Sequence, residues 1–256
     1  MAKKSAVAER LESVRARIGE AAARAKRDPN SVTLIAVTKA ATPEAIREVV
    51  GLGVTDLGEG RVQQLVQRAS QMNEVSNRRK VHGDGDAQPK PPAWHMIGTL
   101  QRNKVKPVLP LVACVHSIDS LRLAEEIDVA AAKLGRKVNV MLQLNASEEP
   151  QKHGIAIGAA THLGESIASM PNVQLVGLMT MAELTDDEKA VRAAFRRTRE
   201  VFEEMKWHKT GGPAFRHLSM GMSHDFEIAI EEGSTMVRIG SAIFGEAAAD
   251  ADEDEA

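Results

Sequence analysis

The sequence has no tyrosine and only one cysteine, and its aromatic residues are limited to five phenylalanines and two tryptophans among 256 residues. Any mechanism that needs a phenol is therefore excluded. The single cysteine, Cys114, excludes an intramolecular disulfide bond, which suits a reducing cytoplasm. Cys114 lies in an apolar run and is most simply a small core residue.

Long hydrophobic runs and a strong charge of one sign are also missing. No segment approaches the roughly 18 unbroken apolar residues of a membrane-spanning helix, and the first residues lack the apolar centre of a signal peptide. The formal net charge is -2, so the chain carries no basic footprint for nucleic acid. We therefore expect a cytoplasmic protein that binds neither membranes nor nucleic acid.

What the sequence does contain is an alternation of short apolar segments and amphipathic helical segments. An amphipathic helix is predicted over 5–27, before the first strand. The eight predicted strands are 32–38, 54–57, 93–97, 112–116, 138–144, 173–179, 215–218 and 235–239. Predicted helical segments follow the first seven of these strands, at 42–50, 62–69, 101–109, 119–134, 156–169, 186–207 and 223–232.

Alternating strands and helices imply a parallel sheet. Eight such units in this length predict a single closed (β/α)8 barrel of the TIM type with an extra N-terminal helix, and an open doubly wound sheet is the alternative. The barrel domain is expected to span 1–246. The polar segment 73–92 is interpreted as a flexible surface insertion, and the acidic segment 247–256 as a disordered tail.

In a barrel of this kind the loops after the strands form the functional face. Lys39 follows the first predicted strand directly. Most lysines in such a place mark where a strand reaches solvent. The alternative is an amine held at the mouth of a pocket, where it can form a Schiff base.

The loops after the last two strands predict a phosphate site. Ser219 and Gly221 follow the seventh strand, and Gly240 and Ser241 follow the eighth. These two loops commonly hold a phosphate in barrels, and glycine lets the backbone approach an anion closely. Arg238 interrupts the apolar eighth strand, where it pairs either with a strand carboxylate or with a ligand heteroatom.

Other candidate sites are weaker. The eight histidines show no metal-ligand spacing, so no metal site is expected, and His95 is interpreted as a satisfied core residue rather than a base. There is no Walker-type loop, serine nucleophile elbow or dinucleotide fingerprint.

A lysine after the first strand, a phosphate cup and a nearby arginine together suggest pyridoxal phosphate. The chain resembles the pyridoxal-phosphate homeostasis proteins of the YggS type over roughly residues 5–246. The runs that carry this resemblance are 35–39, 57–59, 62–63, 94–98, 100–101, 103–106, 116–117, 177–179, 219–223, 233–240 and 242–245.

The resemblance implies a barrel like the N-terminal domain of alanine racemase, which is pyridoxal phosphate fold type III. It implies an internal aldimine on Lys39, a cofactor phosphate on Ser219, Gly240 and Ser241, and Arg238 near the pyridine nitrogen. Arginine does not protonate that nitrogen, so the cofactor would be a poorer electron sink. One departure is Gly60, where the family usually has asparagine; Arg61 follows it, at a position that varies in the family.

Two functions from different classes follow from the resemblance. One is a non-catalytic, monomeric carrier that buffers pyridoxal phosphate and delivers it to apo-enzymes. The other is an amino-acid racemase, whose relatives need a lysine and a tyrosine, the latter on a further β domain. The chain has no tyrosine and no room for that domain after Gly245, so the carrier is favoured and no catalytic residue is expected. A weaker third option is a phosphosugar enzyme in which Lys39 condenses with a carbonyl substrate.

Overall fold

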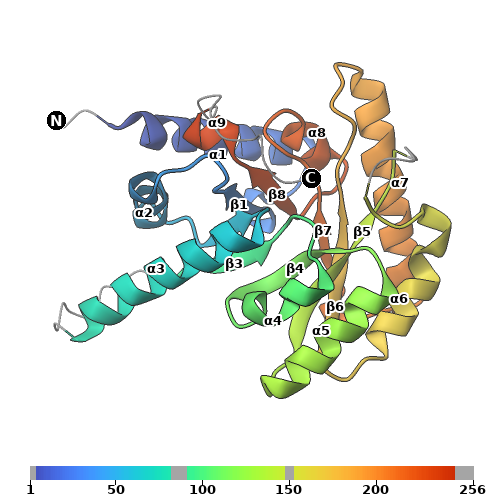
Figure 1. The fold of residues 1–256 in the computed structure, drawn as a ribbon. Helices are drawn as coiled ribbons and strands as arrows, with labels where there is room; N and C mark the ends of the chain where they lie inside the picture. The colour runs from blue at the N-terminus through green and yellow to red at the C-terminus, as the bar shows by residue number, and fades with distance from the viewer. Residues whose placement is uncertain (1–3, 82–90, 148–152, 246–256) are drawn as a thin grey trace.

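The computed structural model describes residues 4–81, 91–147 and 153–245. Its strands form a closed parallel barrel in the order of the sequence, so that β1 pairs with β2 on one side and with β8 on the other (Figure 1). Closure confirms the predicted barrel and excludes the open sheet. The strands are β1 Thr33–Val37, β2 Asp56–Glu59, β3 Ala93–Met96, β4 Val112–Ile118, β5 Val138–Leu144, β6 Val173–Thr180, β7 His217–Ser219 and β8 Met236–Ile239.

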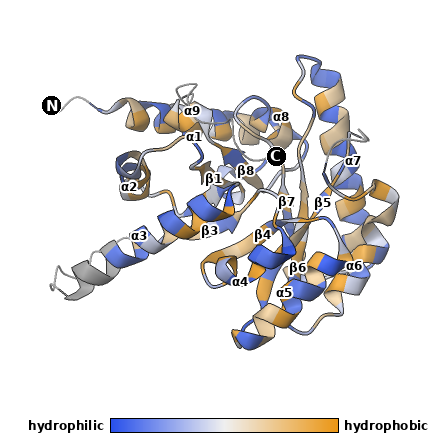
Figure 2. Ribbon diagram, viewed as in Figure 1, coloured by the Kyte–Doolittle hydropathy of each residue, from blue (hydrophilic) through white to orange (hydrophobic). Residues whose placement is uncertain are grey.

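Helices surround the barrel, and each of the longer ones carries both hydrophilic and hydrophobic residues, as a helix between a core and solvent requires (Figure 2). Short 3-10 turns lie at Pro29–Ser31, Arg102–Lys104, Ile157–Ala159 and Gly212–Ala214. The α-helices are α1 Ala6–Arg24, α2 Pro43–Gly51, α3 Val62–Val81, α4 Val105–Val108, α5 Leu121–Lys133, α6 Ala160–Ala168, α7 Glu188–Trp207, α8 Phe226–Glu231 and α9 Ser241–Phe244.

The N-terminal helix α1 closes the seam between the first and last strands. The Ser5 hydroxyl caps it by accepting from Ala8 N over 3.0 Å. The helix packs against α8 and α9, which come from the other end of the chain (Figure 1). Arg17 donates two hydrogen bonds of 2.9 Å to Glu227 of α8, which locks this contact.

The barrel interior is lined by alternate residues of each strand. On β1 and β8, for example, Ile35 and Met236 belong to a small apolar cluster inside the barrel. Their neighbours Ala36 and Val237 point outward into the main core, under the helices. The same alternation turns Arg238 inward, so strand parity decides which polar side chains enter the barrel.

The structure differs from the predicted elements in three places. Residues 73–81, expected within a flexible insertion, form the last turns of α3, which projects away from the barrel in Figure 1. Their polar composition gave no apolar periodicity from which a helix could be predicted. The rest of that segment up to residue 90, and the acidic tail, lie outside the described residues. The helix expected over 101–109 is a 3-10 turn followed by the one-turn α4. The third difference is the short helix α9, which follows β8, where no helix was predicted.

Within the described residues, no helix is both long enough and apolar enough to cross a membrane.

Candidate functional site

Lys39 lies at the rim where the carboxyl ends of the strands emerge. It follows β1 directly, in a tight turn in which Ala41 N donates to Thr38 O over 2.8 Å. Thr38 is fully buried, whereas the Lys39 side chain is exposed. The structure therefore puts the predicted amine at the mouth of the barrel.

A buried hydrogen-bond network fixes the turn that carries Lys39. Glu59, the last residue of β2, is fully buried and forms an ion pair with Arg68 of α3. Arg68 also donates to Thr38 O over 2.6 Å and to Ala41 O over 3.3 Å. The Thr38 hydroxyl lies 2.8 Å from Glu59 Oε2. Because charge-assisted hydrogen bonds hold both ends of the turn, Lys39 stands on a rigid support.

The loops after β7 and β8 lie side by side and form a cup of hydrogen-bonding groups. The Ser223 hydroxyl accepts from the backbone N–H groups of Gly240 and Ala242, each over 3.3 Å. Those N–H groups belong to the first turn of α9, beside Ser241, whose side chain is exposed. A hydroxyl among N–H groups of this kind suits a phosphate.

Two glycines allow the cup to form. Gly221 has φ 96°, and a Cβ there would lie 2.6 Å from the Ala229 Cβ. At Gly240 a Cβ would lie 3.2 Å from Val37 O of the neighbouring strand. The β7 and β8 loops can therefore approach the end of β1, and with it Lys39.

Ser219, which was expected in the cup, lies inside the barrel instead. It is fully buried, and its side chain contacts Arg238 and His116 rather than the cup. Ser223, four residues later, contacts the N–H groups of Gly240 and Ala242 in the cup. Both serines belong to one run of sequence, but Ser219 is the last strand residue and strand parity turns it inward. That parity is the signal that sequence reasoning missed.

Arg238 is 4% exposed and is held by oxygen atoms of two neighbouring strands. It donates to Ser219 O and Oγ, both over 2.7 Å, and to Thr180 O over 2.8 Å. These described hydrogen bonds go to neutral oxygens, not to the strand carboxylate that was one of its two predicted partners. Burial lowers the pKa of Arg238 to about 10, so the guanidinium is still charged at neutral pH.

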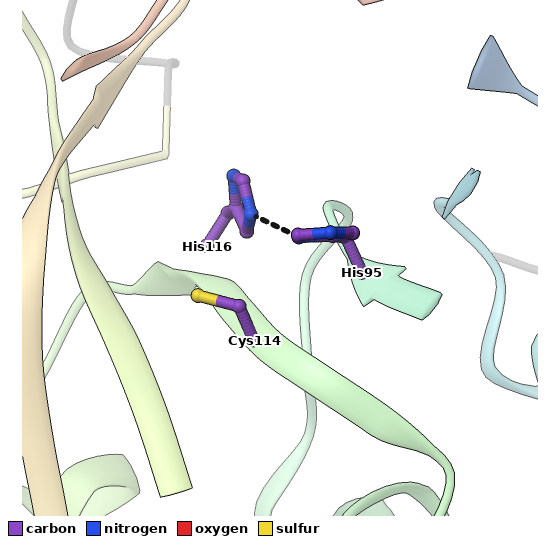
Figure 3. Close-up of side chains that lie close together, drawn as sticks. All are labelled: His95, Cys114 and His116. Carbon is purple, nitrogen blue, oxygen red and sulfur yellow. Dashed lines mark hydrogen bonds between the residues drawn. The ribbon is translucent and has the colours of Figure 1, made fainter. Parts of the chain in front are cut away.

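A chain of hydrogen bonds continues from Ser219 across the barrel interior. His116 Nδ1 lies 2.9 Å from Ser219 Oγ, and His116 Nε2 lies 2.9 Å from His95 Nδ1 (Figure 3). His95 Nε2 in turn lies 3.0 Å from Asp56 Oδ1. His95 is thus the satisfied interior residue that its strand position predicted. The Asp56 end borders a pocket of about 200 Å³ at the opposite, amino-terminal end of the barrel.

His116 is fully buried, and burial lowers its pKa well below the ordinary value, with His95, Arg238 and His217 acting in the same direction. Folded His116 therefore stays neutral, whereas the unfolded residue binds a proton below about pH 6.5. The unfolded state then binds more protons, so the free energy of unfolding falls as the pH drops below that value. The slope from this residue reaches about 1.4 kcal/mol per pH unit.

Urea unfolding between about pH 7 and pH 5 measures this dependence. The variant His116→Gln, which cannot titrate, is expected to lose stability less steeply than the natural chain over the same range. Equal slopes in the two proteins would contradict a neutral buried His116.

His95, Cys114 and His116 each offer one potential metal-ligand atom, and these atoms lie within 4.8 Å of one another. The barrel brings them together although their spacing in the sequence gave no such signal. Both nitrogens of each histidine ring already have hydrogen-bond partners, however. Burial also raises the pKa of the Cys114 thiol, which disfavours the thiolate that binds metals. The group is better described as a hydrogen-bond chain with a thiol to one side (Figure 3).

Residues 3–248 match the family model described as alanine racemase, N-terminal domain. The chain is 38% identical over 238 residues to the pyridoxal phosphate homeostasis protein of Aquifex aeolicus, covering 93% of this chain and 97% of that protein. The chain belongs to the family of pyridoxal phosphate homeostasis proteins. The Pseudomonas aeruginosa member is 37% identical over 241 residues, which cover 94% of this chain and 96% of that one. The resemblance inferred from the sequence motifs is confirmed.

Solved structures agree with this family. PipY of Synechococcus elongatus, whose structure was solved with pyridoxal phosphate bound, superimposes with a TM-score of 0.77 at 31% identity, covering 93% of this chain and all of PipY. A protein from Bifidobacterium adolescentis gives a TM-score of 0.84 at 35% identity, with 93% and 94% of the two chains covered. Alanine racemase from Corynebacterium glutamicum, at 14% identity and a TM-score of 0.61, shares the fold; this chain covers 63% of it.

Gly60 departs from the asparagine usual in this family, and the structure leaves room for a side chain there. A Cβ at Gly60 would meet no atom within 4 Å, whereas a Cβ at Gly98 would lie 2.1 Å from Gly60 O. Gly60→Asn is therefore expected to fold with an unchanged free energy of unfolding, or one up to about 1 kcal/mol higher, because it restricts the unfolded chain. The control, Gly98→Ala, is expected to destabilise. Urea unfolding of both variants is the measurement, and a large loss in Gly60→Asn would show that the turn requires glycine.

Proposed function

We propose that this chain binds pyridoxal phosphate between Lys39 and the cup of Ser223, Gly240 and Ser241, and that it buffers and hands over the cofactor. The observation that carries the proposal is the pairing of β1 with β8 in the closed barrel. It brings an amine at the end of the first strand next to a phosphate-type cup formed by the last two loops.

The residues present suit this cofactor. Bound pyridoxal phosphate supplies an aldehyde that condenses with a primary amine and a ring that stabilises negative charge. On the protein side, the Lys39 amine stands at the rim, and the Ser223 hydroxyl, which accepts from the N–H groups of Gly240 and Ala242, can donate its own hydrogen to a phosphate. Arg238, charged and buried, would face the ring nitrogen and keep it unprotonated. Ser219 then holds Arg238 rather than the phosphate.

A carrier role fits this set of residues better than amino-acid conversion does. An arginine beside the ring nitrogen weakens the electron sink, and the sequence has no tyrosine to act as a second base. We expect a monomer that acts in the cytoplasm and gives its cofactor to apo-enzymes that depend on pyridoxal phosphate.

The test compares pyridoxal phosphate with pyridoxal, which has the aldehyde but no phosphate. Ser223→Ala removes a hydrogen-bonding group at a charged ligand and is expected to weaken pyridoxal phosphate binding about tenfold or more. Binding of pyridoxal should not change. Spectral titration of the natural chain and the variant measures both. The absence of pyridoxal phosphate binding by the natural chain would overturn the proposed function, and an equal loss for both ligands would overturn the role of the cup.

A further inference from the structure

We propose that Asp56, His95, His116 and Ser219 form a one-way hydrogen-bond chain that positions Arg238 and connects it to the pocket at the far end of the barrel. The contact between Arg238 and pyridoxal phosphate rests on the proposed function. The chain itself is a property of the protein alone, so the two can fail separately.

The direction of the chain follows from its Asp56 end, and the Arg238 end is compatible with it. A guanidinium can only donate, so Arg238 donates to Ser219 Oγ, and the Ser219 hydroxyl keeps its own hydrogen, which it can donate to His116 Nδ1. An ionised carboxylate can only accept, so His95 Nε2 must carry the proton that Asp56 accepts.

The contact between the two rings then has one solution. His95 Nδ1 and His116 Nε2 lie 2.9 Å apart, and one of them must carry a proton. With Nε2 protonated, a neutral His95 has a bare Nδ1 that can only accept, so a neutral His116 donates to it from Nε2 and accepts from Ser219 on Nδ1. The proposed chain therefore has both histidines as Nε2–H tautomers, and every hydrogen bond points from Arg238 toward Asp56.

Although burial lowers the pKa of Arg238, the charge of Asp225 acts on the guanidinium directly and raises that pKa, and the chain gives Arg238 a second, remote counter-charge. The guanidinium is buried among neutral oxygens, and aligned hydrogen bonds in a low-dielectric interior polarise one another. At the far end, burial raises the pKa of Asp56, but hydrogen bonds from His95 and Thr55 outweigh it, so the net pKa is lowered and the carboxylate stays ionised. The two charges thus stabilise each other through the four links between them.

A proton that enters from the pocket would reverse the chain. Protonation of His95 on Nδ1 forces His116 to carry its proton on Nδ1 and to donate to Ser219, whose hydroxyl hydrogen must then turn elsewhere. Ser219 Oγ would then accept hydrogen bonds from both His116 and Arg238. The His116 N–H group would therefore compete with the guanidinium for the same oxygen. The charged or titratable groups that face the chain are Asp56, Cys114, Arg216, His217 and Arg238, and Asp225 faces Arg238.

Nitrogen-15 NMR of the histidine rings tests the chain in the cofactor-free protein. At neutral pH we expect a protonated Nε2 and a bare Nδ1 for both His95 and His116, assigned by loss of signals in His95→Gln and His116→Gln. An imidazolium at either residue, or a protonated Nδ1 on His116, would overturn the proposal. So would one equivalent of zinc that stays with the purified protein and is lost in Cys114→Ser, because metal binding uses the same ring nitrogens.

The second readout is the release rate and the spectrum of bound pyridoxal phosphate, after a substitution at the far end of the chain. Asp56→Leu removes the final acceptor and is expected to speed pyridoxal phosphate release about tenfold and to make the spectrum of the bound cofactor depend on pH. Asp56→Asn keeps a carbonyl acceptor but loses the charge, so its release rate should lie between those of the natural chain and Asp56→Leu. Thr198→Val, which removes a buried hydroxyl from α7 outside the chain, is the control for a general loss of stability. Equal release from Asp56→Leu and Thr198→Val would overturn the coupling; a natural chain that binds no cofactor overturns only the proposed function.

Discussion

Replacing Lys39 with alanine is expected to abolish covalent retention of pyridoxal phosphate and to leave the fold intact. Lys39 is the amine that the β1 turn presents at the rim beside the cup, and its exposed side chain lies outside the core. Surface substitutions of this kind usually change stability by no more than about 0.5 kcal/mol. The visible band of the bound cofactor after gel filtration, together with urea unfolding, measures both parts of the expectation.

Lys104→Ala is the matched control, because Lys104 is also exposed and follows a barrel strand, in the 3-10 turn after β3. It is expected to keep the cofactor band of the natural chain. A Lys39→Ala protein that still carries a band reducible by borohydride would contradict the assigned role of Lys39.

The second large effect is expected at the support of the Lys39 turn. Glu59→Ala removes the carboxylate from a buried ion pair and leaves Arg68 with a charge that only the neutral oxygens of Thr38 and Ala41 contact in the described network. Breaking a buried pair in this way costs about 3–5 kcal/mol. The free energy of unfolding should fall by that amount, and pyridoxal phosphate binding should weaken because the turn loses its support.

The exposed pair Glu44–Arg47 on α2 is the comparison. Its side chains are 74% and 48% exposed, and pairs of this kind contribute less than about 1 kcal/mol. In urea unfolding, Glu59→Ala should therefore lose much more free energy of unfolding than Glu44→Ala. Similar small losses in the two variants would show that the buried pair does not hold the turn.

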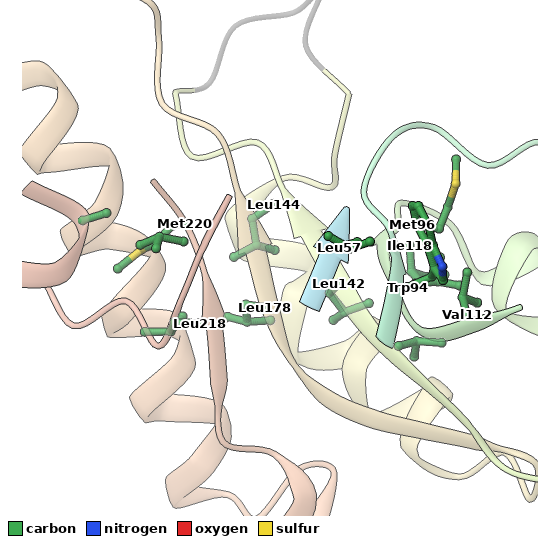
Figure 4. Packing of buried hydrophobic residues seen from close by; sticks show 14 of the residues in the cluster. Leu57, Trp94, Met96, Val112, Ile118, Leu142, Leu144, Leu178, Leu218 and Met220 are labelled. Atoms are coloured by element: carbon green, nitrogen blue, oxygen red, sulfur yellow. The ribbon is translucent and has the colours of Figure 1, made fainter. Parts of the chain in front are cut away.

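The barrel itself could be predicted because its strands are short, apolar and evenly spaced. The span 138–144 predicted for the fifth strand is that of β5. Outward-facing residues such as Leu57, Leu142, Leu178 and Leu218 pack in the main core around the barrel, as their apolar character implies (Figure 4). Because the first and last strands pair in a closed barrel, the predicted fold was enough to place Lys39 near Gly240, although they are far apart in the sequence.

What could not be predicted depended on direction and on distant partners. Ser219 and Ser223 are equivalent as residue types, and only the point at which β7 ends decides that one faces the interior and the other the cup. His95 and His116 lie on adjacent strands β3 and β4, and their contact with Ser219 of β7 exists only after closure. The end of α3 was missed because the sequence of 73–81 is polar and shows no apolar helical periodicity.

The most direct measurement of the central claim is the site at which the cofactor becomes fixed to the protein. The protein is saturated with pyridoxal phosphate, reduced with borohydride, digested and mapped by mass spectrometry. We expect the reduced cofactor on the peptide that contains Lys39 and on no other lysine, with the signal lost in Lys39→Ala. A reduced adduct on a different lysine, or none at all, would contradict a cofactor site at the closure of β1 against β8.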